Sequence, residues 1–212
     1  MLRRIFAIAL SLCLVLGGAA PWAQLSGGIQ AVSADEWEYT IDGGVLKKYN
    51  GSGGDITIPS EVVTIGEKAF ENNENVTKVT IPGSVSEIKW DAFKGCRELQ
   101  EVVFEKGTKL TIRGDAFSFC PKLAEFTVPA HADYIVANIF KGDKSLKNIK
   151  VDAENKKYHE KDGVLFGPVA KDNEPDVLIP GVLKLQAYPS GKQGAYAIPD
   201  TVDGLQIGRA HV

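Results

Sequence analysis

Few residues in this sequence have the types and spacing that enzyme chemistry or metal binding requires. The chain contains three histidines, at positions 131, 159 and 211, and none of them takes part in an H-E-x-x-H pattern. The sequence also lacks C-x-x-C pairs, EF-hand loops and the G-x-S-x-G turn of serine hydrolases. We therefore expect no catalytic residue, no metal site and no cofactor.

The strongest candidate for cation binding is an acidic segment that contains Asp152, Glu154, Glu160 and Asp162. Carboxylate oxygens are the ligands that Ca²⁺ takes in proteins. Three lysines lie among these residues, which is typical of an ordinary solvated loop. We favour the solvated loop, with a calcium site as the alternative.

The composition fits one folded domain. The chain has 212 residues, of which 44% are hydrophobic, and its formal net charge is −3. This hydrophobic content is enough for a real core. No run of basic residues alternates with aromatic residues, so we expect no nucleic-acid partner.

The residues that would position any site recur along the chain at a nearly constant interval. Phenylalanines occur with spacings of 23, 24 and 23 at Phe70, Phe93, Phe117 and Phe140. An isoleucine precedes each of them by five residues. Equal spacing in several columns is the pattern of a solenoid, in which each unit buries its apolar side chains against the next.

Each repeat divides into two segments. In segments such as residues 99–104, apolar residues alternate as in a short half-buried strand. In I-G-x-x-A-F segments, such as residues 65–70, this alternation is missing, which favours a helix or a tight turn. We expect a β-rich α/β leucine-rich-repeat solenoid, horseshoe-like, whose coils of about 23 residues stack their strands about 4.8 Å apart in a parallel ladder.

The repeat sequence resembles a known family. Residues 58–70 read I-P-S-E-V-V-T-I-G-E-K-A-F, and residues 81–96 read I-P-G-S-V-S-E-I-K-W-D-A-F-K-G-C. Both are similar to the BspA-type leucine-rich repeat, roughly I-P-x-S-V-x-x-I-G-x-x-A-F-x-x-C-x-x-L. The resemblance implies a secreted or cell-surface protein that adheres to host proteins. The third unit departs from the pattern, with Phe104-Glu105 in place of Ile-Pro and one extra residue near Lys109-Leu110.

Cys96 and Cys120 occupy the same repeat column, each three residues after its phenylalanine. Stacked coils could place the two Cα atoms within the roughly 4.4–6.8 Å that a disulfide spans. The column also contains Asn73 and Asp143, so the position works without a bridge. We favour two inward-facing thiols that act as small packing residues, with a disulfide as the alternative.

Residues 1–34 have the layout of a secretory signal peptide. Arg3 and Arg4 precede an apolar run from Ile5 to Leu16, and small residues follow. The run is short for a permanent span, so we expect cleavage after Ala34 and no stable membrane span afterwards. An uncleaved membrane anchor is the alternative.

The remaining sequence divides by how closely it follows the repeat. In residues 35–54, apolar and polar residues alternate on both sides of an Asp-Gly-Gly turn, which predicts an N-terminal capping hairpin. Residues 55–151 are the regular repeats. Residues 152–197 are expected to be degenerate repeats with hairpin excursions around Asp162-Gly163 and Ser190-Gly191.

The C-terminal residues begin a further repeat and then leave the pattern. Residues 198–205 restore the Ile-Pro start, and Leu205 falls in the column of Ile65. Residues 206–212 match the translation of a common sequencing adapter, so we expect them to be a non-native tail on a truncated fragment.

The candidate binding site is the outward-facing side of the predicted strands, because solenoid faces of this kind form extended binding surfaces. Its residues are Lys78, Thr80, Glu101, Val103, Glu125, Thr127, Asn148 and Lys150. We expect a host or matrix protein or glycan as the partner of a non-enzymatic adhesion protein. One alternative is a repeat arm of a larger secreted peptidase or glycan hydrolase whose catalytic domain is missing. Another is a purely structural spacer.

Overall fold

The structure is a computed structural model that describes residues 38–136, 138–171 and 174–208. The predicted signal peptide lies outside the described residues, as do residues 209–212 of the predicted tail. From Tyr39 onward the regular elements of the described residues are all β-strands. In the described part of the chain, no helix is long and apolar enough to cross a membrane.

The expected N-terminal hairpin is present. Strand β1 (Tyr39–Asp42) pairs antiparallel with β2 (Val45–Tyr49). The two turn residues Gly43 and Gly44 have φ angles of 55° and 75°, a left-handed conformation that glycine adopts at little cost. Strand β2 then pairs in parallel with the first coil, so the hairpin covers the end of the stack.

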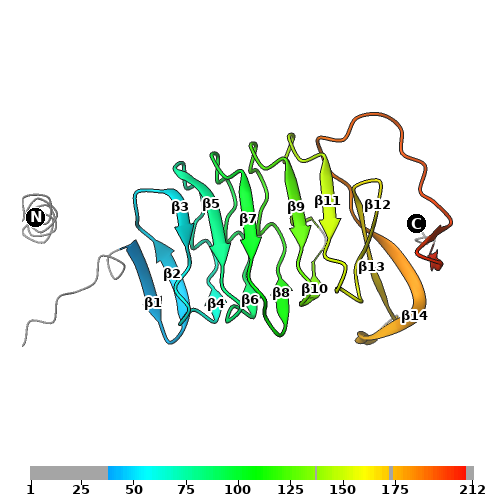
Figure 1. Cartoon of the computed structure of the whole chain (residues 1–212), viewed down its shortest axis with the longest axis horizontal. Helices are drawn as coiled ribbons and strands as arrows, with labels where there is room; N and C mark the ends of the chain where they lie inside the picture. Colours follow the sequence, from blue (N-terminus) through cyan, green and yellow to red (C-terminus); the bar gives the residue numbers. More distant parts are fainter. Residues whose placement is uncertain (1–37, 137, 172–173, 209–212) are drawn as a thin grey trace, which may run out of the picture. The chain divides into compact units, whose positions relative to one another are not determined.

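Two rows of strands run side by side along the stack (Figure 1). The predicted row contains β3 (Gly54–Thr57), β5 (Val76–Ile81), β7 (Glu101–Phe104), β9 (Glu125–Val128) and β11 (Asn148–Val151). A second row, which the sequence analysis missed, contains β4 (Thr64–Ile65), β6 (Glu87–Ile88), β8 (Leu110–Ile112) and β10 (Ala132–Ile135). Each strand of this second row ends at one of the isoleucines that precede the phenylalanines by five residues.

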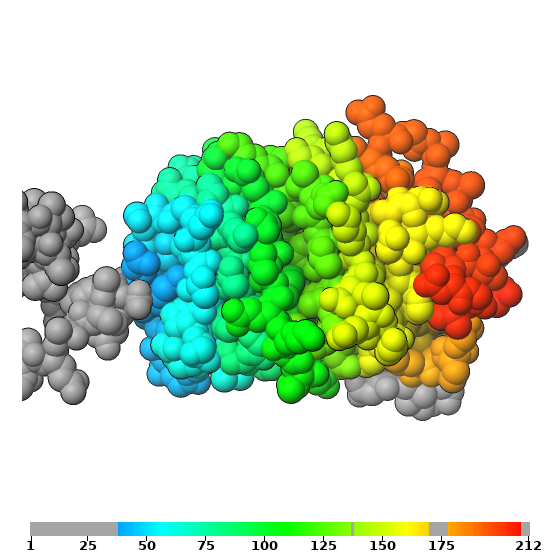
Figure 2. Space-filling model, viewed as in Figure 1, coloured from blue at the N-terminus to red at the C-terminus, as the bar shows by residue number. Residues whose placement is uncertain are grey.

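The predicted column of phenylalanines forms a continuous buried stack. Ring centroids are 5.0 Å apart between Tyr49 and Phe70, 4.6 Å between Phe70 and Phe93, and 5.1 Å between Phe93 and Phe117. Phe140 extends the stack at 6.4 Å. Adjacent coils therefore cover one another's rings, and successive colours form adjacent bands in the space-filling view (Figure 2). The stacked solenoid predicted from the spacing is confirmed.

The I-G-x-x-A-F segments form tight turns rather than helices. In each coil the residue before the alanine column has a left-handed backbone, with φ between 54° and 70°. These residues are Lys68, Asp91, Asp115 and Asn138. Asp and Asn tolerate this conformation better than most side chains, which explains their recurrence there.

The cysteine column is buried and contains no bridge. Cys96 and Cys120 are free thiols, and each Sγ donates to a carbonyl of the preceding coil, Phe70 or Phe93, at 3.2 Å. Asp143 occupies the same column one coil later, and its Oδ1 accepts from the Cys120 N–H at 2.7 Å. Its Oδ2 is buried with no hydrogen-bond partner among the described residues. Burial raises the pKa of Asp143 to about 7.

The C-terminal part forms a separate sheet with the order β12-β13-β14-β16-β15. These strands are β12 (His159–Lys161), β13 (Val164–Lys171), β14 (Glu174–Ala187), β15 (Thr201–Val202) and β16 (Leu205–Ile207). The hairpin expected at Asp162-Gly163 joins β12 to β13.

The structure differs from expectation at two places in this sheet. The second hairpin joins β13 to β14, and no strand occurs in residues 188–200 around Ser190-Gly191. Leu205 does not continue the column of Ile65 but lies opposite Val202 in an antiparallel pair. Residues 164–187 lack the repeat columns, and their two largely apolar segments pair with each other instead of stacking on a further coil.

Candidate functional site

The predicted strand face lies on β5, β7, β9 and β11. Its eight residues are exposed or half-exposed. In register across the strands, the face pairs Lys78 with Glu101, Thr80 with Val103, Glu125 with Asn148, and Thr127 with Lys150. The site therefore consists of two parallel rows of side chains.

The charged side chains of the face pair with one another across the strands. Lys78 Nζ lies 3.0 Å from a Glu101 carboxylate oxygen, and Lys150 Nζ lies 2.7 Å from Glu125. The Lys150 ammonium is the main reason that the pKa of Glu125 lies below its ordinary value. The Asn148 amide, which donates to a Glu125 carboxylate oxygen at 3.4 Å, has a smaller effect in the same direction. Exposed pairs of this kind contribute little to stability, so a partner can exchange with them at low cost.

Strand β3 adds two residues to the face that the sequence analysis did not include. Asp55 lies opposite Lys78, and Thr57 lies opposite Thr80. Asp55 also accepts a hydrogen bond of 2.7 Å from the Thr77 hydroxyl. The alternation of Ile56 and Ile58 around these residues is the sequence signal that could have identified them.

The row of strands is interrupted between β7 and β9, which belong to different sheets (Figure 1). Two rings lie at the interruption: Phe104 and Phe126 make an edge-to-face contact with centroids 5.8 Å apart. In the coil before each ring, Ile81 corresponds to Phe104 and Val102 corresponds to Phe126. Because an aromatic ring needs more room than an aliphatic side chain, we expect these two rings to oppose close pairing of β7 with β9.

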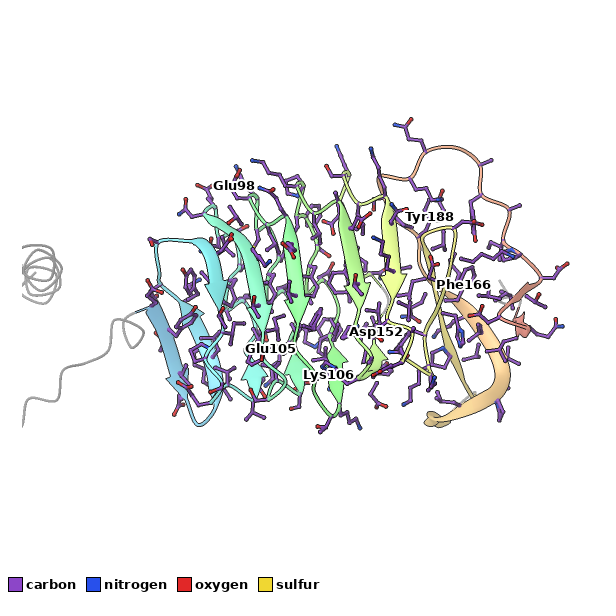
Figure 3. The ribbon with its side chains drawn as sticks, in the orientation of Figure 1. Glu98, Glu105, Lys106, Asp152, Phe166 and Tyr188 are labelled. Atoms are coloured by element: carbon purple, nitrogen blue, oxygen red, sulfur yellow. The ribbon has the colours of Figure 1, made fainter. Side chains whose placement is uncertain are left out.

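A groove of about 590 Å³ lies at this interruption. Val103 and Phe104 provide apolar surface along it. Three carboxylates, those of Glu101, Glu125 and Asp152, also line it. Asp152 follows the end of β11 (Figure 3). The groove thus combines open strand edges, apolar surface and acidic groups at the centre of the face.

The other candidate polar groups are used in local contacts. Asp152 accepts from the Glu154 N–H at 2.9 Å, and Glu160 accepts from the Gly163 N–H at 3.1 Å. His159 Nδ1 lies 2.7 Å from an Asp203 carboxylate oxygen and joins β12 to the β15–β16 turn. Among the described residues, no three His, Cys, Asp or Glu side chains gather into a group that could hold a metal ion.

Burial lowers the pKa of His131. The His131 ring lies next to Gly107, a residue of the loop that follows β7. The third histidine, His211, lies outside the described residues. The histidines therefore provide no cluster for chemistry in the described part of the chain.

Comparison with known proteins places the repeats in a family. A family model described as "BspA type Leucine rich repeat region" matches residues 48–161 in six copies. These residues contain the whole strand face. No curated protein matches the chain.

Several solved structures of bacterial proteins are similar to this chain. The pneumococcal vaccine antigen PcpA is 26% identical, with a TM-score of 0.53 over 69% of this chain and 38% of that one. A leucine-rich repeat protein from Bacteroides capillosus is 27% identical, with a TM-score of 0.46 over 55% of this chain and 99% of that one. A leucine rich cell surface protein from Faecalibacterium prausnitzii is 20% identical, with a TM-score of 0.37 over 82% and 65% of the two chains. The present chain spans well under half of the pneumococcal antigen.

Proposed function

Because the chain belongs to the BspA-type leucine-rich repeat family, we propose that it is a secreted or cell-surface protein whose strand face binds a protein of the host or its matrix. The observation that carries this proposal is the interrupted face. Two rows of exposed or half-exposed side chains run across four strands, and a groove of about 590 Å³ opens between β7 and β9.

The chemistry of the face supports a protein partner rather than a small molecule. The surface is extended and mixes threonines with exchangeable ion pairs, such as Lys78 with Glu101. Interfaces place a small apolar centre inside a polar rim. Val103 and Phe104 in the groove provide such a centre, and the paired charges surround it.

The proposed location and non-catalytic role rest on the family and on the leader-like N-terminus. The pneumococcal relative is a vaccine antigen. Residues 1–34 have the basic and apolar layout that directs export. A surface protein of this kind contacts its partners through exposed repeats.

The test measures binding of the whole chain to purified extracellular-matrix glycoproteins by biolayer interferometry. One variant replaces Lys78, Glu101, Glu125 and Lys150 with alanine. The matched control replaces Glu74, Arg97, Glu98 and Lys122, which form two exposed ion pairs away from the strand face. Both variants remove two acidic and two basic side chains, so the net charge is the same.

We expect the wild type and the control to bind at least one glycoprotein, and the strand-face variant to lose that binding. Circular dichroism should give the same unfolding temperature for both variants, because exposed pairs contribute little to stability. Equal binding by the two variants would place the binding surface elsewhere and overturn the proposal. Failure of the whole panel to bind would also count against it.

A further inference from the structure

The second row of strands ends at β10, where side chains rather than another strand close the edge. The Ile135 N–H donates to the Tyr158 hydroxyl at 2.6 Å, and Gln186 Nε2 donates to the Ile135 carbonyl at 2.8 Å. Tyr158 stands 23 residues after Ile135, in the next place of the isoleucine column. A tyrosine and a glutamine reach further than a backbone pair does, so space remains between β10 and β14.

This space is a cavity of about 620 Å³, lined by residues on and beside β8, β10, β13 and β14. Among the described lining residues, four cationic side chains face a single carboxylate, that of Asp133. The cations are Lys109, Arg113, Lys157 and Lys184. The chain as a whole carries a net charge of −3. A concentration of positive charge in a concave site on an acidic protein favours an anionic ligand.

The ion pairs around the cavity orient these cations without cancelling them. Asp133 pairs with Lys157 and lies 3.3 Å from Lys109 Nζ. The Lys157 ammonium is the main reason that the pKa of Asp133 lies below its ordinary value. Arg113 Nε lies 2.8 Å from Glu87. Lys184 is exposed and has no carboxylate partner among the residues that the structure describes. Even with Glu87 counted, positive charge exceeds negative charge among the described residues at the cavity.

An exposed ring lies beside the cations. Tyr134 lines the cavity and is 50% exposed, and Leu178 on β14 is 39% exposed. An acidic peptide could be held by the cations alone and would leave this flat surface unused. An acidic sugar uses both features, because its ring packs on an aromatic face while its anionic groups accept charge-assisted hydrogen bonds.

We propose that this cavity binds an acidic oligosaccharide. Its carboxylate or sulfate groups pair with Lys184, Arg113 and the lysines held by Asp133, and one sugar ring lies on Tyr134. The site is separate from the strand face, because its residues belong to the β8–β10 row and the C-terminal sheet. The proposal therefore stands or falls independently of the proposed function.

The test is calorimetric titration of the whole chain at low ionic strength with four probes. A heparin-derived hexasaccharide carries sulfates and carboxylates, a hyaluronan hexasaccharide carries carboxylates alone, chitohexaose is neutral, and a hexaglutamate peptide is acidic without sugar rings. One variant combines Arg113→Gln with Lys184→Gln, and a second is Tyr134→Ala. The matched control combines Arg97→Gln with Lys122→Gln, which removes two exposed cations that do not line the cavity.

We expect at least one acidic hexasaccharide to bind and chitohexaose not to bind. The Arg113 and Lys184 double variant should weaken binding about tenfold, and the control should leave it unchanged. The Tyr134→Ala variant should weaken saccharide binding several-fold while its circular dichroism spectrum stays native. Binding that the cavity variants leave unchanged would overturn the proposal, and so would failure of both acidic saccharides to bind. Hexaglutamate binding as tight as saccharide binding, and insensitive to Tyr134→Ala, would show a site for acidic peptides instead.

Discussion

Replacing Asp143 with asparagine should remove a pH-dependent destabilisation of the fold. The carboxyl is buried, Oδ1 accepts from the Cys120 N–H, and Oδ2 has no partner among the described residues. Asparagine has the same shape and keeps an oxygen that can accept from the Cys120 N–H, and its NH2 group takes the place of the second carboxyl oxygen. The substitution therefore removes the charge that this site can carry, and any cost of burying the amide N–H groups is the same at every pH.

The magnitude follows from the pKa of the Asp143 carboxyl. Its rise from 3.8 to about 7 corresponds to about 4 kcal/mol of unfolding free energy. The folded state holds the proton more tightly, so this contribution is fully present below pH 3.8 and is lost as the pH rises to about 7. The value is an upper limit, because any relaxation that brings water to the carboxylate lowers the cost of its charge.

The assay is urea-induced unfolding, followed by circular dichroism between about pH 5 and pH 8, of the wild type and Asp143→Asn. The variant should gain stability over the wild type as the pH rises, and this gain should approach the limit given above at the upper end. Asp162→Asn, at an exposed turn residue, is the control and should show no such trend. A stability difference between wild type and Asp143→Asn that stays constant with pH would refute the assignment of a neutral buried acid.

Two further predictions concern the interruption of the strand row and the export of the chain. Exchanging Phe104→Ile together with Phe126→Val should let β7 and β9 pair, so hydrogen exchange should show greater amide protection at residues 101–104 and 125–128. Unchanged protection would mean that the two rings do not hold the strands apart. Expression of the whole chain in a bacterium with a secretory pathway should yield an exported protein whose N-terminal residue is Asp35, as read by N-terminal sequencing. An exported protein that keeps residues 1–34 would instead be anchored by them.

The core of the stack was predictable because it repeats. A side chain such as Phe93 meets its equivalents Phe70 and Phe117 in the neighbouring coils, so the spacing along the chain already specifies the contact in space. The hairpin before the repeats was predictable for a local reason, since Gly43 and Gly44 determine the turn. The positions of the strand-face residues followed from the alternation within each strand.

The candidate sites depend on features that do not repeat. At the interruption between β7 and β9, Phe104 of one coil meets Phe126 of the next. The sequence marks Phe104 as a departure from the Ile-Pro pair, but it does not show that this ring lies against Phe126. The groove beside it is also lined by Asp152, which follows the end of β11.

The sequence by itself determined the solenoid, its inward-facing columns and its N-terminal cap, because periodic residues meet their own equivalents. Only the tertiary structure decided where the strand row opens and how the C-terminal sheet closes the stack. It also decided that Arg113, Tyr134 and Lys184 line one cavity. These arrangements depend on side-chain volume and on pairing between segments far apart in the chain, which no single repeat column contains.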